Sequence, residues 1–206
     1  MTDTLLQYIS VTTILAATPG ATTAVVIRNT VARGRRAGLL VAAGAALANT
    51  TWAILAAVGV AVLIAHSPPI LRILRDGGGL YLLWLGGRSL VRALTTRAHD
   101  ALPAPTTTAA NAHAAFRQGL LTNLLNPPIM TFYLIVVPTF LPPGGGAGAF
   151  AMLAAIHISI AFACHAIWAT AFATIGHWLS SAGAKRVLDG ATGVAMLFLA
   201  ARVLLK

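Results

Sequence analysis

Long apolar stretches, separated by short polar or basic connectors, recur along almost the whole chain. A helix needs about 20 mostly apolar residues to cross the hydrocarbon core of a bilayer. The pattern therefore predicts an all-α integral membrane protein with six transmembrane helices. We place these at residues 5–27, 37–65, 70–94, 119–141, 150–175 and 187–205. The last stretch is short and carries Arg202, so a five-span arrangement with an interfacial final segment stays open.

Composition supports a membrane protein. Only 9% of the 206 residues are charged and 58% are hydrophobic, whereas soluble domains carry roughly 25% charged residues. Six spans use nearly the whole chain, which predicts one transmembrane domain and no soluble domain. Its parts are a first three-helix repeat at 1–94, a cytoplasmic linker at 95–118 and a second three-helix repeat at 119–206.

The basic residues set the orientation and the partners. They fall mainly in the connectors after the first, third and fifth spans, which carry Arg28, Arg33, Arg35, Arg36, Arg88, Arg92, Arg97, Arg117, Lys185 and Arg186. The opposite side has Arg72, Arg75, Arg202 and Lys206. The positive-inside rule then places these three connectors in the cytoplasm and both termini outside the cell (inner) membrane. Because the net charge of +10 lies between apolar runs, it does not form a nucleic-acid-binding stripe on a soluble face.

Two of the six predicted helices contain a break. Thr18-Pro19-Gly20 interrupts the first span and Asn126-Pro127-Pro128 interrupts the fourth. The chain thus divides into two three-span halves that each open with a broken helix. An odd number of spans per half requires opposite insertion, which is the sequence pattern of an inverted-repeat transporter.

The two breaks lie at equal depth. Pro19 precedes the basic marker Arg28 by about nine residues, and Pro127 follows Arg117 by about ten, so at about 1.5 Å rise per residue each break lies roughly 13–15 Å from the cytoplasmic face. Half of a typical hydrocarbon core is about 15 Å. Both breaks are therefore expected at the bilayer midplane.

These breaks are the candidate substrate site. A proline leaves backbone carbonyls without partners, which neighbouring groups or a water-lined cavity must satisfy. We predict that Pro19, Gly20, Asn126 and Pro127 shape the site, with Thr18, Thr22 and Asn123 as polar contacts for a zwitterion. The alternative interpretation is a pair of plain proline kinks.

Three motifs carry a family resemblance. They are the first-span pattern from Thr18-Pro19-Gly20 to Arg33-Gly34-Arg35-Arg36-Ala37-Gly38, the third-span pattern Gly78-Gly79-Leu80-Tyr81-Leu82-Leu83-Trp84-Leu85-Gly86, and the fourth-span entry from Phe116-Arg117-Gln118-Gly119 to Asn126-Pro127. In order and spacing the chain resembles the lysine exporter (LysE/RhtB) family of amino-acid efflux transporters. The resemblance implies a bacterial exporter of amino acids or related metabolites, driven by proton antiport. Members of that family often have Pro-Asn where this chain has Ala21-Thr22, and lysine where it has Pro128.

Further candidate residues lie in other spans. His157 and His165 in the fifth span are candidates for proton coupling, because histidine titrates near neutral pH and ionisable groups inside membranes are usually functional. A neutral histidine bonded across the bundle is the alternative. Asn49 and Tyr81 are candidate substrate contacts, and both are equally compatible with packing.

Other classes of function are less consistent with the sequence. An enzyme would need a nucleophile with a base, paired carboxylates or a metal cluster, and the four acidic residues are scattered. No cofactor or metal is expected. Export of metal or other ions, and a non-transporting accessory role, stay as alternatives. The expected partners are a small amino-acid substrate, protons and the lipid bilayer. A homodimer would use the Ala- and Gly-rich faces of the second and fifth spans, because small residues allow close helix packing.

Overall fold

The computed structural model describes residues 2–59, 67–95, 109–144, 146–174 and 182–205. All regular elements in these ranges are helices, which confirms the predicted all-α class. In chain order they are α1 (Thr2–Ala17), α2 (Ala21–Arg33), α3 (Arg35–Ala57), α5 (Pro68–Thr95), α6 (Ala109–Leu124), α7 (Pro127–Thr131), the π-helix η1 (Phe132–Val136), α8 (Val137–Thr139), α9 (Ala147–Thr174) and α10 (Ala182–Leu204).

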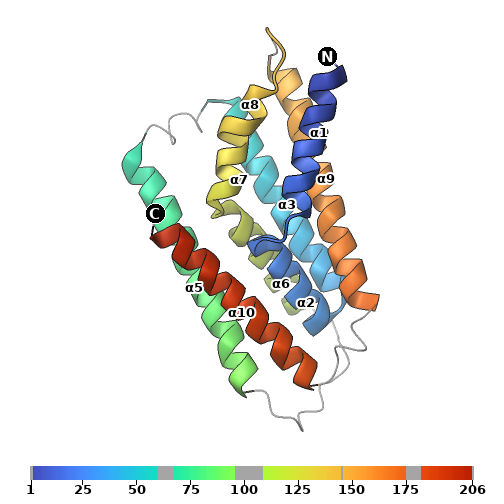
Figure 1. The fold of residues 1–206 in the computed structure, drawn as a ribbon, viewed down its shortest axis with the longest axis vertical. Coiled ribbons are helices and arrows are strands. Elements are labelled where there is room, and N and C mark those ends of the chain that lie inside the picture. The colour runs from blue at the N-terminus through green and yellow to red at the C-terminus, as the bar shows by residue number, and fades with distance from the viewer. Residues whose placement is uncertain (1, 60–66, 96–108, 145, 175–181, 206) are drawn as a thin grey trace.

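The helices form a main bundle and a flanking pair (Figure 1). Within the bundle, α3 packs against α2, α6 and α9. The pair consists of α5 and α10, which run side by side and join the bundle mainly through contacts between α10 and α2. This arrangement brings helices from the first and second halves of the chain into contact.

Several helices are able to cross a membrane. Within the described residues, α3 and α9 are long and apolar enough on length and composition alone. The bent pairs α1 with α2, and α6 with the segment from α7 to α8, pass the same test when each pair counts as one span. The flanking helices α5 and α10, with 28 and 23 residues, do not pass it. Six spans therefore stay a prediction.

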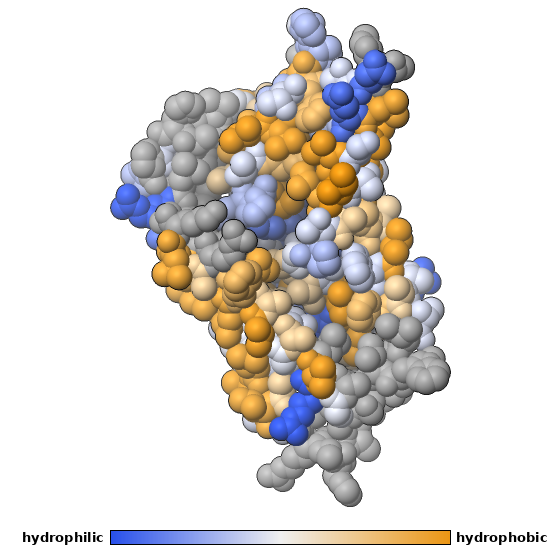
Figure 2. Space-filling model, viewed as in Figure 1, coloured by the Kyte–Doolittle hydropathy of each residue, from blue (hydrophilic) through white to orange (hydrophobic). Residues whose placement is uncertain are grey.

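The outer surface suits contact with lipid. Hydrophobic side chains cover much of the face shown in Figure 2. Large apolar residues such as Leu80, Ile167 and Phe198 are 61%, 66% and 61% exposed. Soluble monomers rarely expose contiguous apolar patches larger than a few hundred Å², so this surface fits a bilayer rather than water.

Two glycines allow α3 and α6 to touch backbone to backbone. A methyl group on Gly44 would collide with the Phe116 carbonyl oxygen, and one on Gly119 would collide with the Val41 carbonyl oxygen. Each helix thus has a glycine, which lacks a side chain, at the point where the other helix approaches. The glycine face of the second predicted span, expected at a homodimer contact, is occupied within the chain.

The two predicted helix breaks are present. Between Ala17 and Ala21 the chain bends by 52°, and between Leu124 and Pro127 it bends by 59°. Proline explains both bends, because it lacks the amide hydrogen and clashes with the carbonyl one turn earlier. At the second break, the indole Nε1 of Trp52 donates a 3.1 Å hydrogen bond to the Leu124 carbonyl oxygen. The side chain of α3 thereby satisfies an acceptor at the end of α6.

Some helix boundaries differ from the predicted spans. The first bent helix continues to Arg33 instead of ending at residue 27. The predicted linker 95–118 is helical from Ala109 onward. Alanine explains this difference: residues 109–115 read Ala-Ala-Asn-Ala-His-Ala-Ala, and alanine is the best helix former even where a stretch is not strongly apolar. Residues 96–108 of that linker, and the predicted end of the second span after residue 59, lie outside the described residues.

Candidate functional site

A cavity of about 230 Å³ lies where the two helix breaks meet. Thr18 and Gly20 line it at the first break, and Asn126 and Pro128 line it at the second. Every long helix adds to the wall, through Leu15, Ala16, Ala21, Asn49, Leu82, Asn123, Ile129, Phe132, His157, Ala161, His165 and Leu199. The breaks, more than 100 residues apart in the chain, thus form one site.

A row of buried polar side chains crosses the site. The Thr22 hydroxyl donates a 3.0 Å hydrogen bond to Oδ1 of Asn123. Nδ2 of Asn123 donates to Oδ1 of Asn49 at 2.6 Å and to the Ala45 carbonyl oxygen at 3.1 Å. Thr22, Asn49 and Asn123 are only 5%, 2% and 2% exposed. These bonds join α2, α3 and α6 and fix the orientation of the Asn123 carboxamide.

Two amide groups remain for a ligand. In the hydrogen bonds of the described residues, Asn49 uses its Oδ1 as an acceptor, which leaves its Nδ2 as a donor at the cavity wall. The Asn126 side chain also lines the cavity. Although Asn126 precedes α7, its side chain makes no capping hydrogen bond. Both amides are therefore able to contact a polar solute.

Two histidines line the cavity from α9. His157 and His165 are 3% and 8% exposed. Nδ1 of His157 lies 2.7 Å from the Tyr133 hydroxyl in a hydrogen bond, and its ring lies 4.1 Å from the Phe132 ring, centroid to centroid. His157 is therefore held on two sides. The predicted coupling residues and the predicted substrate residues share one cavity.

The structure brings together most of the candidate residues, but not all of them. The cavity wall includes Thr18, Gly20, Asn49, Asn123, Asn126, His157 and His165. Thr22 lies behind Asn123 rather than in the wall. Pro128 rather than Pro127 lines the cavity, and Pro19 is exposed.

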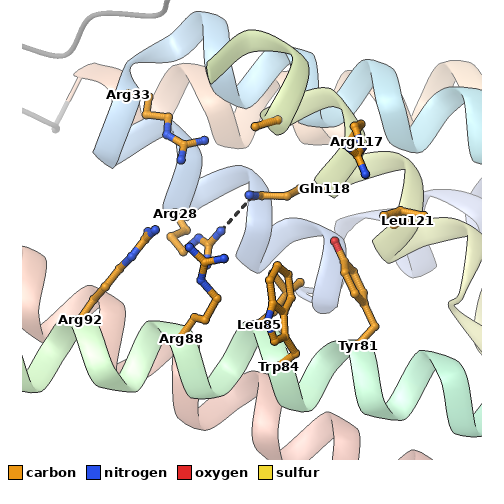
Figure 3. A pocket seen from close by; sticks show the side chains of 11 residues that line it. Arg28, Arg33, Tyr81, Trp84, Leu85, Arg88, Arg92, Arg117, Gln118 and Leu121 are labelled. Carbon is orange, nitrogen blue, oxygen red and sulfur yellow. Dashed lines mark hydrogen bonds between the residues drawn. The ribbon is translucent and has the colours of Figure 1, made fainter. Parts of the chain in front are cut away.

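Tyr81 lies in a different place from the one expected. It lines a second pocket of about 300 Å³ between α2, α5 and α6, together with several arginines (Figure 3). On the next residue of α5, Leu82 faces the cavity at the breaks instead. Adjacent helical residues point in directions about 100° apart, so one residue of difference moves the side chain to another pocket.

The apolar part of the cavity wall is not among the sequence candidates. Leu15, Phe132 and Leu199 lie there, each from a different part of the chain. In an apolar span no sequence signal separates a leucine that faces a cavity from one that faces lipid. The polar residues were recognisable because they are rare in such spans.

The described residues hold no group of three or more His, Cys, Asp or Glu side chains able to hold a metal ion. The chemistry of the cavity wall is that of amides, a hydroxyl, imidazoles and hydrocarbon. Such a wall suits noncovalent binding of a small solute. Together with the apolar exterior, it defines a helical membrane protein with a binding cavity at two broken helices.

Comparison with known proteins identifies the family. The LysE type translocator profile matches residues 13–206. The chain therefore belongs to the LysE type translocator family, and it is a membrane protein of the transporter class. No solved structure matches the chain.

Three relatives are informative. A leucine efflux protein of Klebsiella pneumoniae is 34% identical over 131 residues, covering 63% of this chain and 59% of the relative. The uncharacterized membrane protein YahN of Escherichia coli is 36% identical over 118 residues, covering 57% and 52%. YrhP of Bacillus subtilis, also an uncharacterized membrane protein, is 30% identical over 145 residues, covering 68% and 69%. The match to the leucine efflux protein thus spans less than two thirds of that relative.

Proposed function

We propose that this protein exports amino acids with neutral aliphatic side chains through the cavity at the helix breaks. One observation carries the proposal: both breaks line a single cavity that combines free amide groups with a hydrocarbon wall. Pockets for drug-sized ligands measure about 300–1,000 Å³. A cavity of about 230 Å³ is scaled to a smaller solute.

The wall matches the parts of such an amino acid. The amides of Asn49 and Asn126 contact its polar end. Ala21, the first residue of α2, also lines the cavity, and the partial positive charge at a helix N-terminus favours a carboxylate. Leu82 and Phe132 surround the side chain. The lining residues that the structure describes include no Asp, Glu, Lys or Arg, which favours a side chain without charge.

The relatives support the same substrate class. The Klebsiella protein is named for leucine efflux, and leucine has the neutral aliphatic side chain that the cavity favours. The direction of transport, from inside to outside, is also taken from this relative.

For the transport cycle we propose six spans in two inverted three-helix repeats. The matched breaks and the contact between Thr22 and Asn123 across them support this arrangement. We place the arginine-rich end of the bundle in the cytoplasm and both termini outside the inner membrane, following the positive-inside rule. Export is coupled to proton entry, with His165 and His157 as proton carriers at the cavity wall. A homodimer would use the Ala-rich face of α9, because the glycines of α3 already contact α6 within the chain.

Efflux from proteoliposomes tests the proposal. Vesicles are loaded with labelled leucine, valine, alanine, lysine or glutamate, a pH gradient is imposed, and loss of label is followed for wild type and Asn126→Ala. We expect gradient-dependent efflux of the neutral aliphatic amino acids, reduced about tenfold or more by Asn126→Ala, because a hydrogen bond to a charged group contributes about 1.5–3 kcal/mol.

The control is Gln7→Ala, which removes an exposed amide from α1 outside the cavity and is expected to transport like wild type. A folded, correctly oriented protein that moves none of the five amino acids contradicts the export proposal. Efflux that favours lysine or glutamate would leave export standing and overturn the neutral substrate class.

A further inference from the structure

Five arginines surround the pocket that contains Tyr81. This arginine pocket is lined by Arg28 and Arg33 from α2, Arg88 and Arg92 from α5, and Arg117 from α6 (Figure 3). It has a volume of about 300 Å³ and is separate from the cavity at the helix breaks, with which it shares no lining residue. The ligand of the arginine pocket is therefore considered separately from the transported solute.

Arg28 gives the pocket a fixed cationic wall. The residue is only 5% exposed. Its Nη1 donates to the Ser89 hydroxyl at 3.1 Å, and its Nη2 donates to Oε1 of Gln118 at 2.9 Å. The same Gln118 oxygen accepts a 3.0 Å hydrogen bond from Asn29. These two hydrogen bonds hold Arg28 in place. Because a guanidinium carries five N–H donors, the others remain for a ligand in the pocket.

The charges around the pocket call for an anion. Arg28 is repelled by Arg92 and Arg33 and attracted by one carboxylate, Asp189 of α10. Asp189 does not line the pocket. Among the described residues that line the pocket, five are arginines and none is acidic, so the lining carries an excess of positive charge. Arginine binds phosphate and carboxylate groups through paired N–H donors, so this is suitable chemistry for either.

The pocket continues into a hollow on the outer side of α5. Trp84, Arg88 and Arg92 line both, and the hollow adds Leu83, Gly87 and Val91. Trp84 and Val91 are 50% and 59% exposed. The Arg88 guanidinium carbon lies 4.9 Å from the centre of the Trp84 ring. A ligand that fills both spaces has an anionic head and an apolar tail.

The position along the helices suits a lipid headgroup. Arg33 is the last residue of α2, and Arg92 is in the last turn of α5. Exposed apolar residues of α5, among them Leu80 and Leu94, lie along the same helix. Arginines at the end of a membrane helix are typical of the cytoplasmic headgroup level, and basic pockets between helices bind anionic lipid heads.

We propose that the arginine pocket binds the phosphate of an anionic phospholipid whose acyl chain lies along the outer face of α5. The lipid neutralises the arginines and fills the space between α5 and α6. The phosphate could also come from a free anion, and the experiment separates the two sources. The proposal does not depend on amino-acid export.

Lipid binding to the purified full-length protein is measured by native mass spectrometry. The probes are dioleoyl phosphatidylglycerol and dioleoyl phosphatidylcholine, which have the same acyl chains and differ in headgroup charge. Wild type is expected to bind the anionic lipid about tenfold more tightly, as charge-assisted hydrogen bonds imply. Arg88→Gln with Arg92→Gln is expected to lose this preference.

The matched control is Arg35→Gln with Arg36→Gln, which removes two exposed arginines of α3 outside the pocket. It is expected to keep the preference, and an equal loss in both double variants would overturn the proposal, since the attraction would then be general. If the Gln variant fails to fold, Arg88→Lys with Arg92→Lys keeps the charge and removes the paired donors. A preference unchanged in that Lys variant also counts against the site.

Competition identifies the source of the phosphate. Millimolar inorganic phosphate or glycerol phosphate is added to the protein with bound lipid. Retention of the lipid supports the proposal, whereas release by inorganic phosphate shows a site for free anions and overturns it. Release by leucine would assign the pocket to the transported solute and overturn it as well.

Discussion

The Thr22 hydroxyl donates a 3.0 Å hydrogen bond to the Asn123 carboxamide across a sequence separation of 101 residues. Thr22 lies in the first turn of α2, just after the first helix break, and Asn123 lies just before the second. The bond therefore joins the two breaks directly. It is a contact between the two halves of the chain at the place where substrate is proposed to bind.

Replacing Thr22 by valine removes this donor and keeps the shape of the side chain. We expect the free energy of unfolding in lipid or mixed micelles to fall by about 0.6–2 kcal/mol, the range for hydrogen bonds between membrane helices. Thr13→Val is the control, because the exposed Thr13 hydroxyl bonds only to the Ile9 carbonyl in its own helix. Equal losses of unfolding free energy in the two variants would show that the hydrogen bond across the breaks does not stabilise the protein more than a bond within one helix.

Gly119→Ala tests the close approach of α3 and α6. The added methyl group meets the Val41 carbonyl oxygen, and overpacking of this kind costs about 1–3 kcal/mol. A lower melting temperature and a lower yield of folded protein are expected. In Gly148→Ala the new methyl group meets no atom within 4 Å, and helix propensity favours alanine by up to about 1 kcal/mol. The two substitutions are thus expected to act in opposite directions.

His165→Asn tests proton coupling. If His165 carries the proton, efflux driven by a pH gradient falls at least about tenfold, while exchange of labelled for unlabelled leucine without a gradient continues. The control is His113→Asn, in which an exposed histidine of α6 is changed. Parallel losses of driven efflux and exchange would instead assign His165 to binding or folding.

Ala161→Leu tests the location of the substrate side chain. Ala161 is 5% exposed and lines the cavity, so a larger residue takes up the space for an aliphatic side chain. Transport of leucine is expected to fall by about 10–200-fold relative to alanine, the usual range for small changes of volume in an apolar pocket. Ala163→Leu, at an exposed position on the same helix, is expected to leave the ratio unchanged.

The polar residues of the candidate site were predictable because polar residues and prolines are rare in membrane-spanning helices. Proline in an apolar span marks a break wherever the helix lies, and Asn123 and Asn126 are conspicuous among apolar neighbours. The depth of the two breaks, derived from Arg28 and Arg117, stays a prediction, and the structure shows that both breaks line one cavity. Depth along the membrane normal is readable from sequence because each helical residue adds a fixed rise.

Rotation about a helix axis is not readable in the same way. Tyr81 and Leu82 are neighbours in the chain, yet they line different pockets. Which face of α5 points inward depends on its packing against α10, a contact between segments about 100 residues apart. The apolar lining of the cavity and the arginine pocket both depend on such contacts.

The interlocked glycines of α3 and α6 restrict how the molecule can move. Gly44 and Gly119 place each backbone against the other, and Asn123 ties the end of α6 to Ala45 and Asn49 of α3. Sliding one helix along the other would push side chains of one helix into the backbone of the other. We therefore expect α3 and α6 to move together as one rigid unit. A transport cycle that opens the cavity first to one side of the membrane and then to the other must therefore rotate the remaining helices about the α3–α6 pair.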